Sequence, residues 1–73
     1  MQKFRTVEEL GAILRRERKR RGYTQAQLAE FAGIGVSYVV NLERGKRTAE
    51  IGKAFQLASL LSIDLFADER GLS

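Results

Sequence analysis

The strongest constraint on what this chain can fold into is a helical pattern interrupted by glycine between residues 24 and 46. Thr24 is a suitable N-cap, because its hydroxyl can accept a hydrogen bond from a free amide of the first helical turn. Apolar residues at helical spacing follow it: Leu28, Ala29 and Ala32. Gly33 stands where this helix must end, since glycine adopts the left-handed conformation without steric cost. The pattern predicts a helix over residues 25–32.

A second helix is predicted after a connection of only three or four residues, from about Val36 to Arg44. Gly45 provides its stop signal. Val39 and Leu42, together with Ile34 in the turn, are available for the core. Two helices joined by such a short, glycine-containing turn form a helix-turn-helix motif, whose second helix lies in the major groove of DNA.

The same residues resemble the signature of the Cro/repressor-type (Xre-like) helix-turn-helix family. The matching positions are Thr24-Gln25, Leu28-Ala29, Gly33-Ile34, Val39 and Leu42-Glu43-x-Gly45. No single pair is distinctive, but all of them occur in one register over about twenty residues, which makes the signal strong. Gly35 departs from the pattern, because the family generally has Ser, Thr or Asp as the cap of the recognition helix.

The length of 73 residues predicts a single domain over residues 1–73, with a thin core. We expect a helical core over 6–61, a strand over 62–68 and a frayed end over 69–73. Neither a membrane-spanning apolar run nor a signal peptide is present, so a cytoplasmic location is expected.

The composition excludes most catalytic chemistry. The chain has no cysteine and no histidine, which rules out disulfides, thiolate chemistry and the usual zinc sites. It also lacks a phosphate-binding glycine loop and a pair of carboxylates in an apolar setting. We therefore expect a binding protein that is not an enzyme and needs no metal or cofactor.

Charge is distributed unevenly along the chain. Residues 1–47 hold 11 of the 13 Lys and Arg residues and five acidic residues, for a net charge of +6. Residues 48–73 hold two basic and four acidic residues, for a net charge of −2. This distribution favours a polyanion as the partner of the first part, although a basic excess alone can also serve solubility.

The N-terminal part predicts a first helix that begins with a capping box of Thr6 and Glu9. Its apolar stripe consists of Leu10, Ile13 and Leu14, and Gly11 allows close approach of another helix. The helix continues through six basic residues in 15–21 and stops at Gly22. These basic residues form either a solvated face or a set of phosphate contacts, and the interpretation as phosphate contacts is favoured for some of them. Residues 1–5 are either an arm or a strand.

The family resemblance implies two framework roles. Arg18 and Glu43 match an arginine of the first helix and a glutamate late in the recognition helix that pair with each other. Such a pair would lock the two helices together and prevent Glu43 from repelling phosphate. Gln25 matches a position that binds backbone phosphate and braces the recognition helix.

If Val39 and Leu42 point inward, the helical period places a fixed set of residues on the outer face of the second helix. That set is Val36, Ser37, Val40, Asn41 and Arg44. Of these, Val36, Ser37, Val40 and Asn41 are predicted base contacts: Asn41 can bond adenine bidentately, Ser37 can donate or accept, and the two valines suit thymine methyls. The predicted phosphate contacts are Gln25, Tyr38, Arg44, Lys46 and Arg47. Tyr38 lies at the edge of the face, and its second interpretation is as a cover for Leu42.

The C-terminal part predicts a last helix from Ala49 to Leu61, capped by Thr48. Its apolar residues cover more than the stripe that one core needs, so a second copy of the chain is the favoured partner. A folded-back tail within one chain is the alternative. The strand predicted for 62–68 would pair with residues 2–5 or with its own copy. The predicted dimer interface comprises Leu57, Leu60, Leu61, Ile63, Leu65 and Phe66.

Together these features predict an all-α, repressor-like bundle of four to five helices with a short C-terminal β-strand that pairs across a dimer. The layout is similar to that of HipB-type antitoxins, and the resemblance implies a homodimeric repressor of its own operon that also neutralises a HipA-like kinase toxin. The expected partner is double-stranded DNA with an inverted repeat. A stand-alone phage- or plasmid-type repressor and a protein-binding adaptor are the alternatives.

Overall fold

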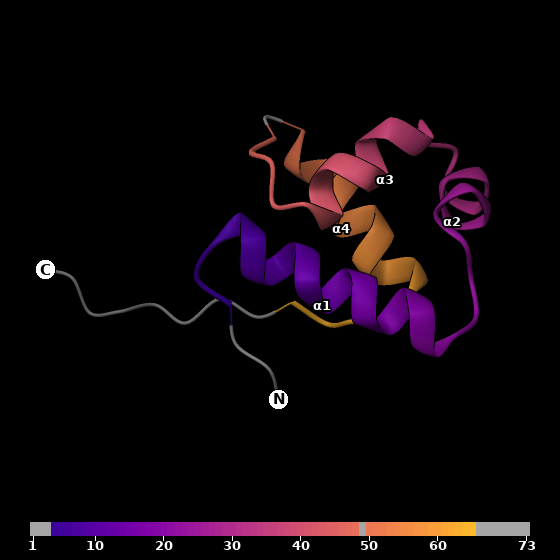
Figure 1. The fold of residues 1–73 in the computed structure, drawn as a ribbon, viewed down its shortest axis with the longest axis horizontal. Coiled ribbons are helices and arrows are strands. Elements are labelled where there is room, and N and C mark those ends of the chain that lie inside the picture. Colours follow the sequence, from indigo (N-terminus) through magenta and orange to yellow (C-terminus); the bar gives the residue numbers. More distant parts are fainter. Residues whose placement is uncertain (1–3, 49, 66–73) are drawn as a thin grey trace, which may run out of the picture.

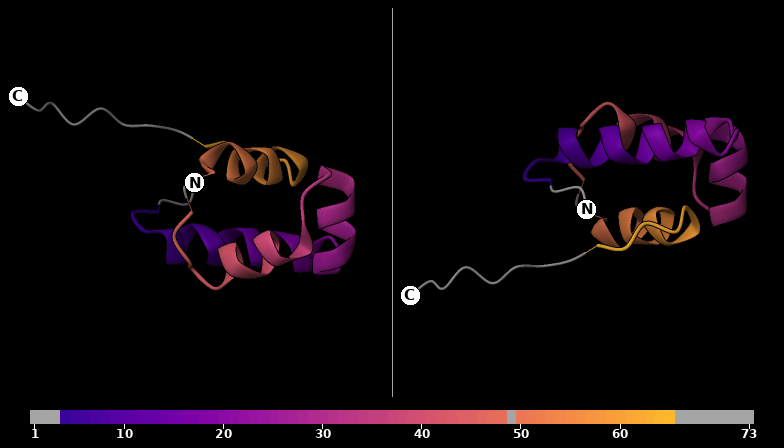
Figure 2. Two further views of the ribbon diagram at one scale, coloured as in Figure 1. Left: turned by 90° about the horizontal axis from the view of Figure 1, so that it is seen from above. Right: turned by 90° about the horizontal axis from the view of Figure 1, so that it is seen from below.

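The computed structural model describes residues 4–48 and 50–65, which form four α-helices and no strand (Figure 1). The helices are α1 (Val7–Arg20), α2 (Gln25–Ala32), α3 (Val36–Glu43) and α4 (Ile51–Leu60). α1 and α3 lie on one side of the molecule, α4 lies across from them, and α2 spans between the two sides at one end (Figure 2). The predicted all-α helix-turn-helix fold is confirmed.

The first two helices begin at threonine caps. The Thr6 hydroxyl accepts a hydrogen bond from the Glu9 amide at 3.1 Å. The Glu9 carboxylate returns to the amide of Arg5 at 2.9 Å instead of that of Thr6, so the predicted capping box is displaced by one residue. At α2 a complete box forms: Thr24 Oγ1 accepts from the Gln27 amide at 3.0 Å, and Gln27 Oε1 accepts from the Thr24 amide at 2.9 Å. This box fixes the start of the helix-turn-helix.

A left-handed residue follows each of the first three helices, and in each case it is glycine. Gly33 has φ 67°, and the next amide, of Ile34, donates to the Ala29 carbonyl at 3.0 Å, which closes α2 as a Schellman motif. α4 ends in the same way at a residue that is not glycine. Ser62 has φ 56°, and the Ile63 amide donates to the Ala58 carbonyl at 2.8 Å. Ser62 therefore ends a helix and does not begin a strand.

The structure assigns no strand to residues 62–65 of the predicted strand 62–68, and the predicted pairing of that strand with a second copy stays a prediction. Residues 63–65 have no strand partner within residues 4–48 and 50–65, and they turn back beside α4 (Figure 2, right). Ile63 and Leu65 are half-buried and pack against the core from this position. The folded-back tail thus covers part of the surplus apolar surface of α4. The rest of the predicted strand, residues 66–68, and the predicted frayed end, 69–73, lie outside the described residues.

The prediction of Thr48 as the cap of α4 is wrong. α4 begins at Ile51 with Glu50 as its N-cap, and no side chain caps it. Thr48 Oγ1 instead accepts a hydrogen bond from the Glu50 amide at 2.9 Å, which stabilises the turn before the helix. Ala49, the predicted first residue of the helix, lies outside the described residues.

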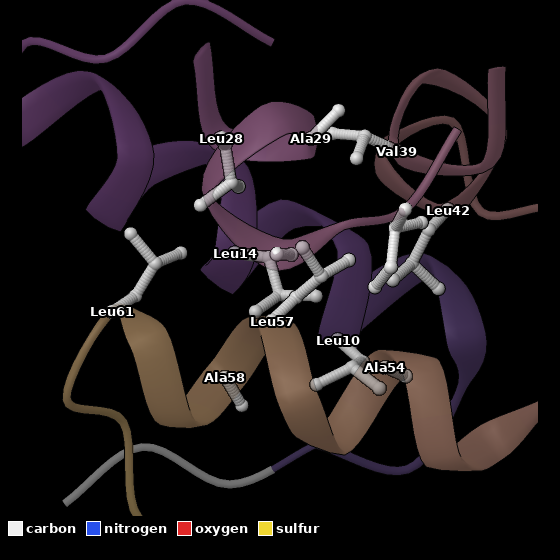
Figure 3. Close-up of a cluster of buried hydrophobic side chains, with 12 residues drawn as sticks. Leu10, Leu14, Leu28, Ala29, Val39, Leu42, Ala54, Leu57, Ala58 and Leu61 are labelled. Atoms are coloured by element: carbon white, nitrogen blue, oxygen red, sulfur yellow. The ribbon is translucent and has the colours of Figure 1, made fainter. Parts of the chain in front are cut away.

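The core is built from apolar side chains of all four helices (Figure 3). The largest fully buried ones are Leu14, Leu28, Val39, Leu42, Leu57 and Leu61. Leu57 is 1% exposed and Leu61 is 0% exposed, so neither side chain has surface to offer a second copy of the chain. Their predicted place in a dimer interface is corrected to the core of a single chain.

The substitution Gly11→Ala tests the close contact between α1 and α3. A Cβ at Gly11 would overlap the carbonyl oxygen of Leu42, a backbone atom that cannot move without displacing α3. We expect Gly11→Ala to lower the free energy of unfolding by about 1–3 kcal/mol, measured by urea denaturation. Gly52→Ala is the matched control, because nothing lies within 4 Å of the added Cβ and alanine favours helix, which stabilises by up to about 1 kcal/mol. Equal stability of the two variants would contradict the packing described.

Candidate nucleic-acid interface

Arg18 and Glu43 form a bidentate ion pair between α1 and α3. Arg18 Nε lies 2.7 Å from Glu43 Oε2, and Arg18 Nη2 lies 2.9 Å from Glu43 Oε1. The third guanidinium nitrogen, Nη1, donates to the Tyr23 carbonyl at 2.8 Å. The two side chains are only 8% and 3% exposed, so the pair is withdrawn from water. The pair has the geometry in which arginine and carboxylate interact most strongly.

The Glu43 carboxylate also receives a hydrogen bond from α2. Gln25 Nε2 donates to Glu43 Oε1 at 3.1 Å, so donors from two other helices converge on one side chain of α3. The hydrogen bonds to Glu43 raise the pKa of Arg18 above its ordinary value, despite burial of the guanidinium. The positive charge of Arg18 is therefore retained at neutral pH, and it compensates the negative charge that Glu43 would otherwise place near the outer surface of α3.

The outer surface of α3 carries the residues that the helical period places there. We call this set, Val36, Ser37, Val40, Asn41 and Arg44, the recognition face. Val36, Ser37 and Arg44 are exposed, whereas Val40 and Asn41 are half-buried. Val39 and Leu42 point into the core, as expected. Lys46 and Arg47 are exposed in the connection that directly follows α3, so amide, hydroxyl and cationic groups lie along one short stretch of surface.

The structure gives Tyr38 a contact other than the predicted one. Its hydroxyl donates to the backbone carbonyl of Glu50 at 2.9 Å, and its ring packs against the core. Lys53 Nζ lies 5.5 Å from the centre of the ring. The hydroxyl hydrogen of Tyr38 is thus donated within the chain, and the predicted contact with phosphate stays a prediction. Its second interpretation, as a cover for Leu42, agrees with this packing, because Leu42 belongs to the core cluster that the ring contacts.

The six basic residues in 15–21 divide into two groups. Three of them are paired: Arg18 forms the buried ion pair with Glu43, and Arg20 and Arg21 form ion pairs with Glu17 at 2.6 Å and 3.6 Å. The hydrogen bonds from Arg20 lower the pKa of Glu17. The other three bases, Arg15, Arg16 and Lys19, are exposed and form no ion pair with a described residue. These three side chains are the ones available to an external anion.

The part of the chain that the structure describes contains no cluster of acidic side chains able to hold a metal ion. None of its helices has both the length and the apolar composition needed to span a bilayer.

The short turn between α2 and α3, the recognition face and the cationic connection that follows define a DNA-binding helix-turn-helix domain. The chain belongs to the helix-turn-helix family, whose model matches residues 14–66. It is 42% identical over 67 residues to an uncharacterized HTH-type transcriptional regulator, y4mF, of Sinorhizobium fredii, with 89% of this chain and 88% of that protein covered. Proteins of this family are DNA-binding regulators and not typically enzymes.

Solved structures share the fold. HipB in a complex with an O2 20mer superposes with a TM-score of 0.83 at 23% identity, covering 94% of this chain and 96% of that chain. The HipB of a HipA-HipB-O2-O3 complex gives a TM-score of 0.83 at 22% identity, with 94% and 97% covered. The restriction-modification controller protein C.AhdI from Aeromonas hydrophila gives 0.70 at 34% identity, with 80% and 84% covered. The similarity to HipB establishes the fold, and C.AhdI is the more similar of the two in sequence.

The buried ion pair predicts a pronounced asymmetry between single and double substitutions. Arg18→Met or Glu43→Gln alone leaves the other group without its partner, and we expect each to lower the free energy of unfolding by roughly 3–5 kcal/mol. The double variant Arg18→Met/Glu43→Leu removes both charges and should be more stable than either single variant, as measured by urea denaturation.

Arg20→Met is the control, because its pair with Glu17 is exposed and should contribute little. Single variants at Arg18 and Glu43 that are no less stable than Arg20→Met would show that the buried pair does not hold the helices together.

Proposed function

We propose that this chain is a homodimeric transcriptional repressor that binds an inverted-repeat operator in double-stranded DNA. The observation that carries the proposal is the recognition face, which Glu43 and its two partners hold on the outside of the bundle without an uncompensated negative charge. Two copies of α3 would enter successive major grooves whose centres lie about 34 Å apart.

Asn41 and Ser37 are the proposed readers of base sequence. The Asn41 amide offers one donor and one acceptor, the combination that pairs bidentately with the edge of adenine in the major groove. Ser37 lies one helical turn earlier on the recognition face and can donate or accept. Val36 and Val40 provide apolar contacts for thymine methyl groups on either side.

Phosphate contacts are proposed to supply most of the affinity. Arg44, Lys46 and Arg47 follow one another at the end of α3, where they would grip the DNA backbone beside the groove. Gln25 stands at the N-terminus of α2, whose free amides also favour an anion. Such contacts release counterions, so binding should weaken steeply with salt.

The second copy is proposed to cover the outer face of α4. Two large apolar residues one helical turn apart remain exposed there, Ile51 at 49% and Phe55 at 52%, and the half-buried Ile63 and Leu65 lie beside Phe55. The net charge beside this face is small, because Lys53 Nζ pairs with Glu50 Oε2 at 3.0 Å and Asp64 adds one negative charge. A face with so little net charge can approach its own copy with little repulsion, in contrast to the basic part of the chain. Of the residues predicted for the interface, Ile63 and Leu65 are retained in this proposal. Leu60 is 43% exposed but lies about half a turn round the helix from Ile51, and Phe66 lies outside the described residues.

An antitoxin role is proposed as the biological context, on the support of the shared fold with HipB, which is solved together with HipA and DNA. On this proposal the protein represses its own operon and binds a HipA-like kinase toxin. The second candidate is a restriction-modification controller, favoured by the 34% identity to C.AhdI. A kinase-like gene beside this one, whose product elutes together with it, supports the first role. Flanking restriction and methyltransferase genes support the second.

Selection of DNA from a random pool, followed by mobility shift at several salt concentrations, tests the proposed function. Wild type should select an inverted repeat and bind it as a dimer. Asn41→Ala should reduce discrimination between the selected site and random DNA by about 1–3 kcal/mol per half-site. Lys46→Ala should weaken binding to both kinds of DNA and reduce the salt slope by about 1 per half-site, because it removes a phosphate contact.

A protein that selects no sequence, or whose discrimination is the same with Asn41→Ala, would reject the groove assignment and bring the adaptor forward. Arg20→Ala is a useful companion variant, because Glu17 already pairs with this charge, and it separates a specific phosphate contact from a general loss of charge.

The proposed dimer face is tested by Phe55→Ser, measured by analytical ultracentrifugation over a range of concentrations. We expect the dimer to weaken by at least tenfold in Kd, because a large exposed aromatic is removed from the centre of the face. Phe31→Ser is the matched control, since Phe31 is 59% exposed, packs edge to face with Tyr23 and belongs to α2, outside the proposed interface. If Phe31→Ser weakens the dimer more than Phe55→Ser does, the interface lies on α2.

A further inference from the structure

Tyr38 connects the recognition helix directly to the start of α4. Its hydroxyl donates to the Glu50 carbonyl at 2.9 Å, across the connection between the two helices. Glu50 is the N-cap of α4, and no side chain of its own region caps that helix. The ammonium group of Lys53, in the first turn of α4, lies 5.5 Å from the centre of the Tyr38 ring, within the range of a cation–π interaction.

This connection matters because the main packing of α3 lies elsewhere. α3 packs chiefly on α1 and α2, and α4 packs chiefly on α2. The relative orientation of α3 and α4 is therefore set largely through intermediaries, apart from the residues that join them. Tyr38 connects the two helices directly: its half-buried ring belongs to α3, and its hydroxyl is hydrogen-bonded to the backbone of Glu50, the residue before α4.

We propose that Tyr38 is a positioning residue that sets the half-site spacing accepted by the dimer. The inference rests on the proposed function, in which α3 reads DNA and the outer face of α4 binds a second copy. If so, the angle between α3 and α4 within each chain fixes the distance and the angle between the two recognition helices of the dimer. Tyr38 does this without touching DNA.

The geometry of DNA makes spacing a sensitive measure of that angle. One inserted base pair moves a half-site by about 3.4 Å along the helix axis and turns it by about 35°, because one turn has about 10 base pairs. A dimer with a stiff joint between α3 and α4 in each chain must deform to follow that change. A dimer with a loosened joint follows it more easily and discriminates less between spacings.

The experiment compares two operators: the inverted repeat selected by wild type, and the same repeat with one base pair inserted at its centre. Tyr38→Phe keeps the ring and the cation–π contact and removes only the bond to the Glu50 carbonyl. We expect the ratio of the two Kd values to fall several-fold in Tyr38→Phe, with the salt slope unchanged. Tyr23→Phe is the matched control, because it removes the same hydroxyl in the connection between α1 and α2, and it should keep the wild-type ratio.

Each other outcome identifies a different role. Equal weakening on both operators with a smaller salt slope would overturn the inference in favour of a phosphate contact at Tyr38. A lower melting temperature with an unchanged ratio of Kd values would reduce Tyr38 to a stabilising residue. If wild type prefers one spacing and Tyr38→Phe shows the same ratio of Kd values, the inference about Tyr38 is rejected but the proposed function is not. Wild type that binds no DNA rejects the proposed function itself.

Discussion

The Glu43 carboxylate is the group on which the arrangement of the helices depends. It is 3% exposed, it belongs to the last residue of α3, and it receives hydrogen bonds from Arg18 of α1 and Gln25 of α2. A buried carboxylate without these donors would be strongly destabilising, so the three helices must meet where the donors converge. The same convergence leaves the outer side of α3 exposed, because its inner side is occupied by the ion pair, Val39 and Leu42.

Local signals made much of this predictable from the sequence. Gly33 and Gly45 mark helix ends because their backbone conformation has positive φ, and Thr6 and Thr24 cap because a hydroxyl stands just before each apolar pattern. The start of α4 was less predictable, since Thr48 has a competing local bond to the Glu50 amide. Periodicity identified the apolar residues of α4 but could not assign Leu57 and Leu61 to the core of one chain rather than to a dimer. That assignment depends on tertiary packing.

The contact of Tyr38 shows what could not be predicted from the sequence about the candidate DNA-binding site. Helical spacing correctly places Tyr38 at the edge of the recognition face, but its partner is a backbone carbonyl 12 residues away, and no local pattern encodes that contact. Two parts of the chain therefore suit different partners. The basic part, from α1 to the connection after α3, suits a polyanion, whereas α4 offers an apolar face with little net charge. Tyr38 lies where these two parts meet.

The central claim, that α3 presents the DNA-binding surface, is tested most directly by following backbone amide resonances while the selected operator duplex is titrated into the protein. We expect the largest shifts at Ser37, Asn41 and Arg44 and at the start of α2, with Tyr23 and Phe31 barely changed. Largest shifts around Tyr23 and Phe31, with the recognition face unperturbed, would contradict it.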